Sequence, residues 1–404
     1  MDFLRGFYGG AVADEPTAAN IGRDVLDAGG SAGDAAVAMY FALAVTKPAS
    51  AGLGAVGACL VYQPREKTVR ALDFTSPPNA SGSVAIPGAV RGMYAVHAML
   101  GRQPWSQLLG PAERLARFGT AATRSFVSDL EARPDVARDE EFGARVRTAG
   151  GGLVGEGDRV VQPALADFIG QIRVSGPAAF YAGPLGERFA EAVGQAGERL
   201  DFSEMRAQAP KLGEPRTQPA GHAEAYFLPF DHTAGPWQAA RWGALAGRER
   251  NGSAGPTTFA PSGTSFVAVD RSGNAVACGL TLNRPFGIGR TAPGTGIFPA
   301  APAEPNMPSG ALSPVLVVNH NTDILLLAAS GSGAGAPGEV VNVGYKATME
   351  RAPLSETFGE AASALVNIVS CPDGMPSQSQ SCRMSADPRG PGYAAASLPR
   401  EGRP

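Results

Sequence analysis

The chain has 404 residues, of which 44% are hydrophobic, and carries a formal net charge of −3. This length and apolar content suffice for a large buried core, in one domain or in two closely packed ones. The small charge without a long single-sign run argues against nucleic-acid binding, and no stretch approaches the roughly 18 consecutive apolar residues of a transmembrane helix.

The N-terminus and the cysteines bear on localisation. The first residues, MDFLRGFYGGAVADEP, lack the apolar core and the cleavage site of a secretory signal. This predicts a cytoplasmic protein, or a periplasmic one if the true N-terminus is missing. The four cysteines are too few and too scattered to indicate a disulfide framework or a zinc site. Cys371 and Cys382 could pair, but two free thiols in a cytoplasmic tail are an equally good interpretation.

The first half of the chain alternates apolar helices with a pair of strands. A helix begins at Thr17 and ends at Gly29-Gly30, and a second, almost wholly apolar helix over 32–45 must be buried. Asp34 fits a carboxylate at the N-terminus of that helix. Two antiparallel strands and four amphipathic helices follow. We expect the strands at 58–62 and 67–74, and the helices near 86–100, 108–118, 164–174 and 185–196.

A helix over 237–245 leads into a Gly-, Ser-, Thr- and Pro-rich loop over 246–262. Asp231 and His232 precede this loop and Ser262 ends it, and these are the residue types of a Ser/His/Asp triad. Nothing in the spacing of the three residues supports that triad.

The stretch 261–296 carries the strongest signal for a site. Its two apolar runs flank Arg271-Ser272-Gly273-Asn274, which predicts a hairpin with Ser272-Gly273 at its tip. A two-residue loop would set Thr264 opposite Thr281, with Asn283 close by. Hydroxyl and amide groups at the end of a strand, followed by a Gly- and Pro-rich loop, predict a functional site.

Two further strands, at 312–318 and 324–329, precede Ser330-Gly331-Ser332-Gly333 and a helix over 339–350. From Cys371 to Pro404 the chain is rich in Pro, Ser, Gln and Arg and lacks apolar periodicity. That composition predicts a disordered tail.

The 261–296 stretch resembles the start of the small subunit of γ-glutamyltranspeptidases (glutathione hydrolases). These are N-terminal-nucleophile hydrolases whose precursor cuts itself before a Thr. The similarity extends over roughly 10–205 and 262–345, with strong motifs in both ranges. The matching residues in the stretch are Val269-Asp270, Gly273-Asn274-Ala275-Val276, Thr281, Asn283, Phe286-Gly287 and Pro293-Gly294-Thr295-Gly296-Ile297.

The resemblance implies an α+β fold, a four-layer αββα sandwich of mainly antiparallel sheets. A large-subunit-like segment, 1–262, and a small-subunit-like segment, 263–370, would form one intertwined domain, followed by the tail 371–404. The implied substrate is a small γ-glutamyl amide or a relative of it. Processing would leave two fragments of one precursor, and the chemistry needs no cofactor and no metal.

The same resemblance implies roles for individual residues. Thr264 would attack the substrate, with its own freed α-amine as the base. Thr281 and Asn283 would bind substrate, and the backbone at Ser332 and Gly333 would stabilise the oxyanion. An ungapped match instead puts Gly263 at the nucleophile position, since a one-residue slip in a strand reverses a side chain. Both alternatives stay open at this point.

Substrate recognition departs from the family's pattern. Thr75 stands where relatives have an Arg that grips the substrate's α-carboxylate, and a hydroxyl cannot replace that charged, bidentate contact. Gly310 and Ala311 stand in place of paired serines, and Glu304 is the single carboxylate in 298–305. The sequence therefore predicts acyl transfer with altered specificity. The alternatives are an uncleaved, inactive homologue that binds or supports other molecules, and an amidase for a different acyl group.

Overall fold

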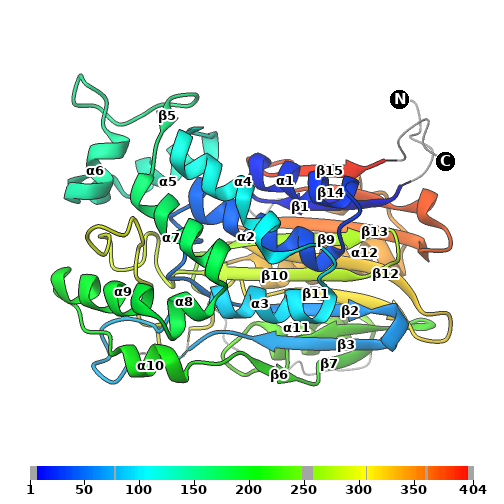
Figure 1. The fold of residues 1–404 in the computed structure, drawn as a ribbon. Coiled ribbons are helices and arrows are strands. Elements are labelled where there is room, and N and C mark those ends of the chain that lie inside the picture. Colours follow the sequence, from blue (N-terminus) through cyan, green and yellow to red (C-terminus); the bar gives the residue numbers. More distant parts are fainter. Residues whose placement is uncertain (1–6, 77–78, 248–257, 306, 360–362, 399–404) are drawn as a thin grey trace.

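The computed structural model describes residues 7–76, 79–247, 258–305, 307–359 and 363–398. Two antiparallel sheets lie face to face between layers of helices (Figure 1). The first sheet has the order β15-β1-β9-β10-β2-β3-β6, with bounds Tyr393–Ser397, Gly9–Ala13, Thr264–Asp270, Ala275–Thr281, Val56–Gln63, Thr68–Asp73 and Lys211–Gly213. The second has the order β14-β13-β12-β11-β8-β7, with bounds Arg383–Ala386, Leu365–Met375, Ile324–Ser332, Val315–Asn319, Ala223–Phe227 and Arg216–Ala220. A separate ribbon joins β4 (Thr120–Ala121) to β5 (Arg159–Val160).

The helices cover the outer faces of the two sheets. Helices α11 (Gly235–Leu245) and α12 (Ala336–Met349) pack on the six-stranded sheet. On the seven-stranded sheet lie α1 (Pro16–Asp27), α2 (Ala32–Thr46), α3 (Ala89–Leu100), α4 (Trp105–Phe118), α5 (Arg124–Ala132), α6 (Glu140–Val146), α7 (Pro163–Ser175), α8 (Ala178–Tyr181), α9 (Pro184–Gln195) and α10 (Phe202–Ala207), directly or through one another. The short α13 (Leu354–Thr357) follows α12.

Three apolar cores separate these layers, one between the sheets and one under each helix layer. This confirms the predicted four-layer αββα arrangement. In the described part of the chain, no helix has both the length and the apolar character needed to cross a membrane.

The start of α2 confirms the expected role of Asp34. The Ser31 hydroxyl accepts from the Asp34 N–H (3.0 Å), and the Asp34 carboxylate accepts from the Ser31 N–H (2.9 Å), which makes a capping box. Every residue of α2 is buried, as its apolar composition predicts. The Ala32 N–H donates to Asp270 (3.0 Å), so the start of this central helix is tied to the end of β9.

The β9–β10 hairpin forms as predicted, but the predicted register is wrong by one residue. Thr264 lies opposite Leu280, not opposite Thr281. The reason is that Gly273 adopts a left-handed φ of +80°, which permits a three-residue loop. The observed register therefore brings Gly263, just before β9, into line with Thr281.

The prediction of a disordered tail was wrong for residues 371–398. Part of β13, and all of β14 and β15, lie in this segment. Strand β15 pairs with β1, with Ser397 opposite Gly9, and thereby forms one edge of the seven-stranded sheet. Residues 399–404 lie outside the described residues, as do 248–257 of the predicted loop 246–262.

All four cysteines are bonded, which corrects the expectation that they form no framework. Cys59 on β2 and Cys278 on β10 lie directly opposite each other and form one disulfide. Cys371 on β13 bonds Cys382, which precedes β14. The interpretation of two free thiols in the tail is therefore wrong, and the Cys59–Cys278 bond joins the segments before and after residue 263.

Removal of the two disulfides should destabilise the protein unequally. Cys59 and Cys278 are 219 residues apart, whereas Cys371 and Cys382 are 11 apart. On chain-entropy grounds, replacing the first pair with Ala should lower the unfolding free energy by about 5 kcal/mol and replacing the second by about 3 kcal/mol. Urea unfolding of the two double variants measures the difference. Free thiols in the denatured, unreduced wild-type protein would contradict the pairing itself.

Candidate functional site

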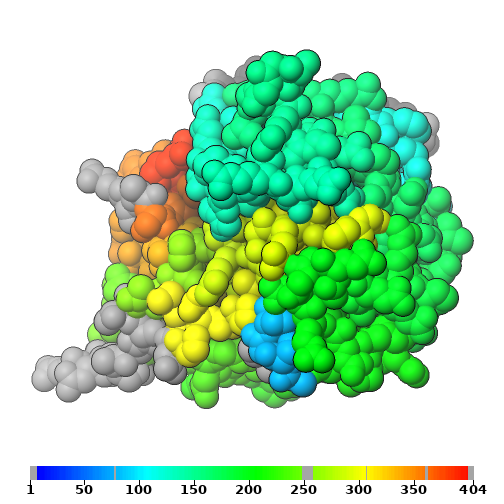
Figure 2. Space-filling view, turned by 90° about the vertical axis from the view of Figure 1, so that its left-hand side faces the viewer, coloured from blue at the N-terminus to red at the C-terminus, as the bar shows by residue number. Residues whose placement is uncertain are grey.

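A cavity of about 920 Å³ opens at the end of the seven-stranded sheet where β10 stops. Its polar side carries Asp73, Thr75, Lys211 and His232, and its apolar side includes Val56 and Leu312. Figure 2 views the molecule from this end of the sheets, with the segment after β10 in yellow between teal and green helical segments. This cavity is the candidate binding site.

Thr264 does not line the cavity. Its side chain is fully buried and follows the alternation of Phe266 and Ala268, which pack in the core between the sheet and the helices. Its hydroxyl donates to Asp14 Oδ2 (2.9 Å), which also accepts from the Ser265 N–H (2.9 Å). The Thr264 hydroxyl is thus held by the buried carboxylate of Asp14, which directly follows β1.

Gly263 directly precedes β9, in line with Thr281 at the end of β10. Its φ is +147°, and a Cβ on it would lie 2.2 Å from the Ala311 Cβ and 2.8 Å from the Leu280 carbonyl oxygen. The backbone and the packing thus both favour glycine here. Ala311 fills the space into which a side chain at position 263 would project.

The carbonyl of Ser262 is polarised by two hydroxyl groups. Thr281 Oγ1 and Ser309 Oγ each donate to it at 3.2 Å. Such paired donors are the arrangement that stabilises negative charge on a carbonyl oxygen during attack. The contacts single out the peptide bond between Ser262 and Gly263, one residue before the predicted cleavage position.

The two residues predicted to bind substrate lie side by side. Asn283 lines the cavity, adopts a left-handed φ of +64° and donates through Nδ2 to the Ala301 carbonyl (2.7 Å). Its N–H donates to Thr281 Oγ1 (2.8 Å). Thr281 is buried, does not line the cavity and donates to the Ser262 carbonyl. Of these two residues, only Asn283 lines the space where a ligand would lie.

Ser332 and Gly333 lie at the end of β12 and do not line the cavity. Ser332 pairs with Leu365 in the sheet. Gly333 has a φ of +95°, and its carbonyl packs closely against Gly310. Their oxyanion role therefore stays a prediction.

Asp231, His232 and Ser262 do not form a triad. The Asp231 carboxylate accepts from Arg216 (3.2 Å) and is 91% exposed, while the buried Ser262 Oγ has no hydrogen-bond partner among the described residues. His232 instead contacts Thr75 Oγ1 (2.8 Å) and Asp73 Oδ2 (3.2 Å) through Nε2. Sequence reasoning missed this cluster because Asp73 and His232 are far apart in the chain.

Two other residues of the site also escaped the sequence analysis. Asp14 precedes α1 beside the helix cap Glu15, and Ser309 lies in a Pro- and Gly-containing loop. Nothing local distinguishes either from an ordinary capping or turn residue. Among the described residues, no group of three or more His, Cys, Asp or Glu side chains is placed to hold a metal ion.

The sequence is similar to those of known proteins over about half of its length. The family profile described as gamma-glutamyltranspeptidase matches residues 18–235. Glutathione hydrolase 2 of Arabidopsis thaliana is 34% identical over 227 residues, which are 52% of this chain and 39% of that protein. Human glutathione hydrolase 7 is 33% identical over 190 residues, which are 43% of this chain and 28% of that protein. The matched regions thus span well under half the length of these relatives.

A solved structure covers nearly the whole chain. The cephalosporin acylase from Bacillus halodurans superimposes with a TM-score of 0.78 over 100% of this chain and 98% of its own, at 17% identity. At that identity the likeness concerns the fold.

Proposed function

The chain belongs to the γ-glutamyltranspeptidase family, and from this premise we propose that its cavity binds an acyl amide, γ-glutamyl or related, while the chain stays in one piece. Acyl transfer from such an amide to water or to an amine is the general chemistry that the family suggests for this cavity. The named hydrolase activities are those of the relatives. The proposal for this chain is binding by an uncleaved homologue.

The observation that supports it is Gly263. The residue beside the polarised Ser262 carbonyl carries no side chain, and Ala311 occupies the space that a side chain would need. The hydroxyl of the next residue, Thr264, is buried and donates to Asp14. A group that attacks an amide must reach its carbonyl carbon, and neither residue does so in the uncleaved chain.

A second candidate function is acyl transfer after self-cleavage at Gly263–Thr264. The contact between the Thr264 hydroxyl and the Asp14 carboxylate favours it, because a carboxylate that accepts from a hydroxyl can orient it and take its proton. In that case Thr264 would be the nucleophile, with Thr281 and Asn283 on the substrate and the backbone at Ser332 and Gly333 on the oxyanion. Cleavage would have to release the first residue of β9 from the sheet, so that the Thr264 side chain could turn toward the cavity.

A denaturing gel of the purified protein separates the two functions. We expect one band near 41.3 kDa and no release of aniline from a γ-glutamyl anilide. Fragments of about 27 and 14 kDa, in proportion to the two segment lengths, would support self-cleavage instead. The gel must contain reductant, because the Cys59–Cys278 bond would hold both fragments together without it.

Two matched variants assign any cleavage that occurs. Thr264→Ala should abolish it and Thr264→Ser should retain it if the hydroxyl is the attacking group. Calorimetric titration with glutaramide tests binding itself. A protein that is intact and folded but binds no acyl amide would overturn the proposed function.

A further inference from the structure

A hydroxyl, a carboxylate and an imidazole meet on one wall of the cavity. They belong to Thr75, Asp73 and His232, which all line it. Thr75 Oγ1 donates to Asp73 Oδ1 (2.6 Å) and lies 2.8 Å from His232 Nε2. Asp73 is the last residue of β3, and the turn that follows the strand fixes Thr75 beside it. These are the residue types that activate a side-chain nucleophile.

The contacts indicate where the hydrogens of this cluster lie. The Asp73 carboxylate accepts from the Thr75 N–H (2.8 Å) and from the Thr75 hydroxyl, and its Oδ2 lies 3.2 Å from His232 Nε2. A neutral ring with its hydrogen on Nε2 makes all three neighbours donors, which suits an ionised carboxylate. The Thr75 oxygen then accepts from Nε2 while its own hydrogen points at Asp73. The cluster is thus complete with an ordinary, uncharged histidine.

This arrangement activates the Thr75 hydroxyl from two sides. Asp73 Oδ1 is within reach of the proton that it would take. The Nε2–H of His232 stabilises the negative charge that develops on the Thr75 oxygen as this proton leaves. A hydroxyl that only capped the turn after β3 would need the Asp73 contact alone. The ring comes from a segment 157 residues away, where it stacks on Phe230 with centroids 5.9 Å apart.

Lys211 adds a positive charge beside the same cluster. It lies opposite Asp73 in the β3–β6 pair, and both side chains line the cavity. Residues that lie opposite each other in a sheet present their side chains on the same face. Lys211 makes no ion pair in the described part of the chain, so its ammonium group is available to stabilise an oxyanion.

We propose that Thr75 is the nucleophile of an esterase activity in this cavity, with Asp73 as its base. The Thr75 oxygen bonds to the acyl carbon, its proton passes to Asp73 Oδ1, and the bond from that carbon to the leaving oxygen breaks. Asp73 then releases the proton to solvent. Water attacks the acyl-threonine in turn, and Asp73 takes a proton from the water and returns it to the Thr75 oxygen as the carboxylic acid leaves.

A short acyl ester is the substrate class that this cluster fits. A phenolate leaves the acyl carbon without taking a proton, whereas an amine must be protonated first. Esters therefore react, and a γ-glutamyl anilide stays intact. Val56 and Leu312, on the apolar side of the cavity, contact the acyl chain. This activity goes beyond the proposed binding of acyl amides and needs no self-cleavage.

Hydrolysis of p-nitrophenyl acetate by the intact chain tests the activity. The reaction should begin with a burst of p-nitrophenol, and acid-quenched protein should carry an acetyl group on Thr75 by mass spectrometry. Thr75→Val should remove this acetyl group and lower the rate about 100-fold, whereas Thr75→Ser should retain both. Asp73→Asn should lower the rate by a similar factor. His232→Phe, which keeps a ring stacked on Phe230, should lower the rate about tenfold and leave the acetyl group on Thr75.

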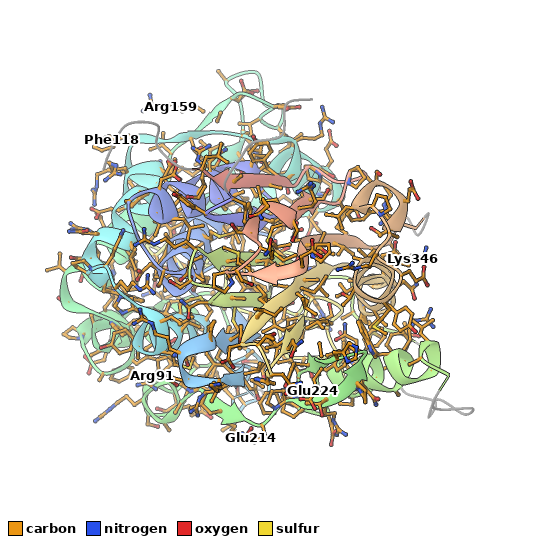
Figure 3. All side chains as sticks on the ribbon, turned by 90° about the vertical axis from the view of Figure 1, so that its right-hand side faces the viewer. Arg91, Phe118, Arg159, Glu214, Glu224 and Lys346 are labelled. Atoms are coloured by element: carbon orange, nitrogen blue, oxygen red, sulfur yellow. A yellow bond between two sulfur atoms is a disulfide. The ribbon has the colours of Figure 1, made fainter. Side chains whose placement is uncertain are left out.

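Two matched controls separate this chemistry from the general reactivity of surface side chains. His222→Gln removes an exposed imidazole between β7 and β8, outside the cavity lining. Lys346→Met removes an ammonium group on α12, which Figure 3 shows well away from Glu214, the residue directly after β6. Both variants should keep the wild-type rate, whereas Lys211→Met should lower it about tenfold.

Two results would overturn the inference. One is a folded Thr75→Val protein that hydrolyses the ester as fast as the wild-type protein. The other is a wild-type protein that gains no acetyl group, or gains one only on lysine or histidine. Titration with glutaramide tests the proposed amide binding separately, so that binding can stand when the esterase activity fails.

Discussion

Gly279→Ala should lower the unfolding free energy by about 3–5 kcal/mol or prevent folding altogether. Gly279 lies in the middle of β10, between Ser265 on β9 and Ala58 on β2. A Cβ at this position would lie 1.7 Å from the Ala311 carbonyl oxygen and 2.6 Å from its carbon. Both are backbone atoms, so no side-chain rotation can relieve the overlap.

The damage should extend to the site. The backbone that would have to move continues on one side to Ser309, which polarises the Ser262 carbonyl, and on the other to Leu312, which lines the cavity. Even a folded Gly279→Ala protein should therefore bind acyl amides poorly. Calorimetric titration with glutaramide, beside urea unfolding, measures both consequences.

Gly194→Ala is the matched control for that substitution. Gly194 lies in α9, and a Cβ there would have no atom within 4 Å. Because alanine has a higher helix propensity than glycine, this variant in the last turn of α9 should gain about 0.5 kcal/mol. Equal stabilities for Gly279→Ala and the wild-type protein would show that Ala311 does not pack on β10 as described.

Local patterns in the sequence identified most helices and the central hairpin, because those signals lie within one segment. The apolar run of α2 and the Gly29-Gly30 stop before it are examples. The register of the hairpin was not predictable in the same way. The sequence Arg271-Ser272-Gly273-Asn274 allows a two-residue or a three-residue loop. The backbone conformation of Gly273, which has a φ of +80° here, decides between them.

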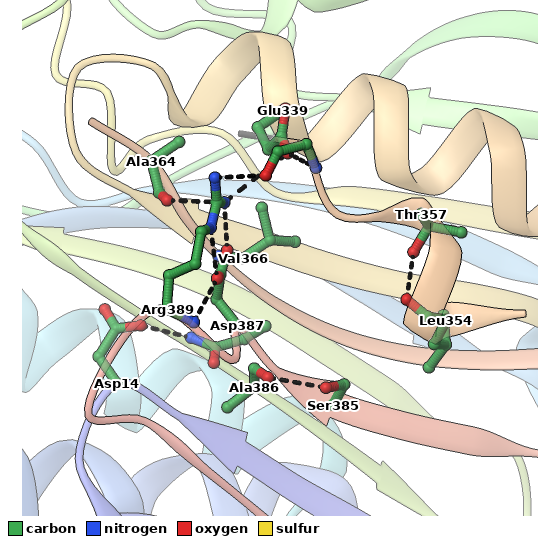
Figure 4. Close-up of polar contacts among 12 residues, drawn as sticks. Asp14, Glu339, Leu354, Thr357, Ala364, Val366, Ser385, Ala386, Asp387 and Arg389 are labelled. Carbon is green, nitrogen blue, oxygen red and sulfur yellow. Dashed lines mark hydrogen bonds and ion pairs between the residues drawn. The ribbon is translucent and has the colours of Figure 1, made fainter. Parts of the chain in front are cut away.

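The C-terminal strands were missed because their partners are remote. Strand β15 is YAAAS, a short run of small residues that gains its stability by pairing with β1 at the other end of the chain. Figure 4 shows a second long-range link, in which Arg389 Nη2 donates to Asp387 Oδ2 (2.6 Å) and to the Ala364 carbonyl (3.0 Å) and lies 3.7 Å from Glu339 at the start of α12. Composition alone cannot reveal such partners.

The site shows the same limit. The position of Asn283 beside the cavity was predictable from its place at a strand end. The contacts of Thr264 with Asp14 and of Thr75 with His232 were not, because they join positions 250 and 157 residues apart. The choice between Gly263 and Thr264 depended on a register that only the folded sheet supplies. For that reason the resemblance predicted the fold better than it predicted the chemistry.

The combined change Gly263→Thr and Ala311→Gly should convert this chain into one that cuts itself between Ser262 and position 263. Removal of the Ala311 methyl group clears the atom that would lie 2.2 Å from the added Cβ, and the Leu280 carbonyl oxygen, 2.8 Å from that Cβ, must shift as well. The new hydroxyl would attack the Ser262 carbonyl carbon, whose oxygen already accepts from Thr281 and Ser309. The C–N bond then breaks to give an ester and a free amine, and water hydrolyses the ester to the Ser262 carboxylate.

Backbone strain at position 263 should assist that cleavage. A threonine at a φ of +147° is strained by about 1–3 kcal/mol, and cleavage releases it. On a reducing gel the band near 41.3 kDa should give way to bands of about 27 and 14 kDa, and the smaller fragment should begin at position 263 by mass spectrometry.

The matched control is Gly263→Ala with Ala311→Gly, which has the same space at position 263 but no hydroxyl and should stay intact. Adding Thr281→Val to the active pair should slow cleavage, because one of the two donors to the Ser262 carbonyl is lost. An active pair that folds with the wild-type circular dichroism spectrum but remains whole would mean that the polarised carbonyl is structural, and Thr264 would then be the residue left to test.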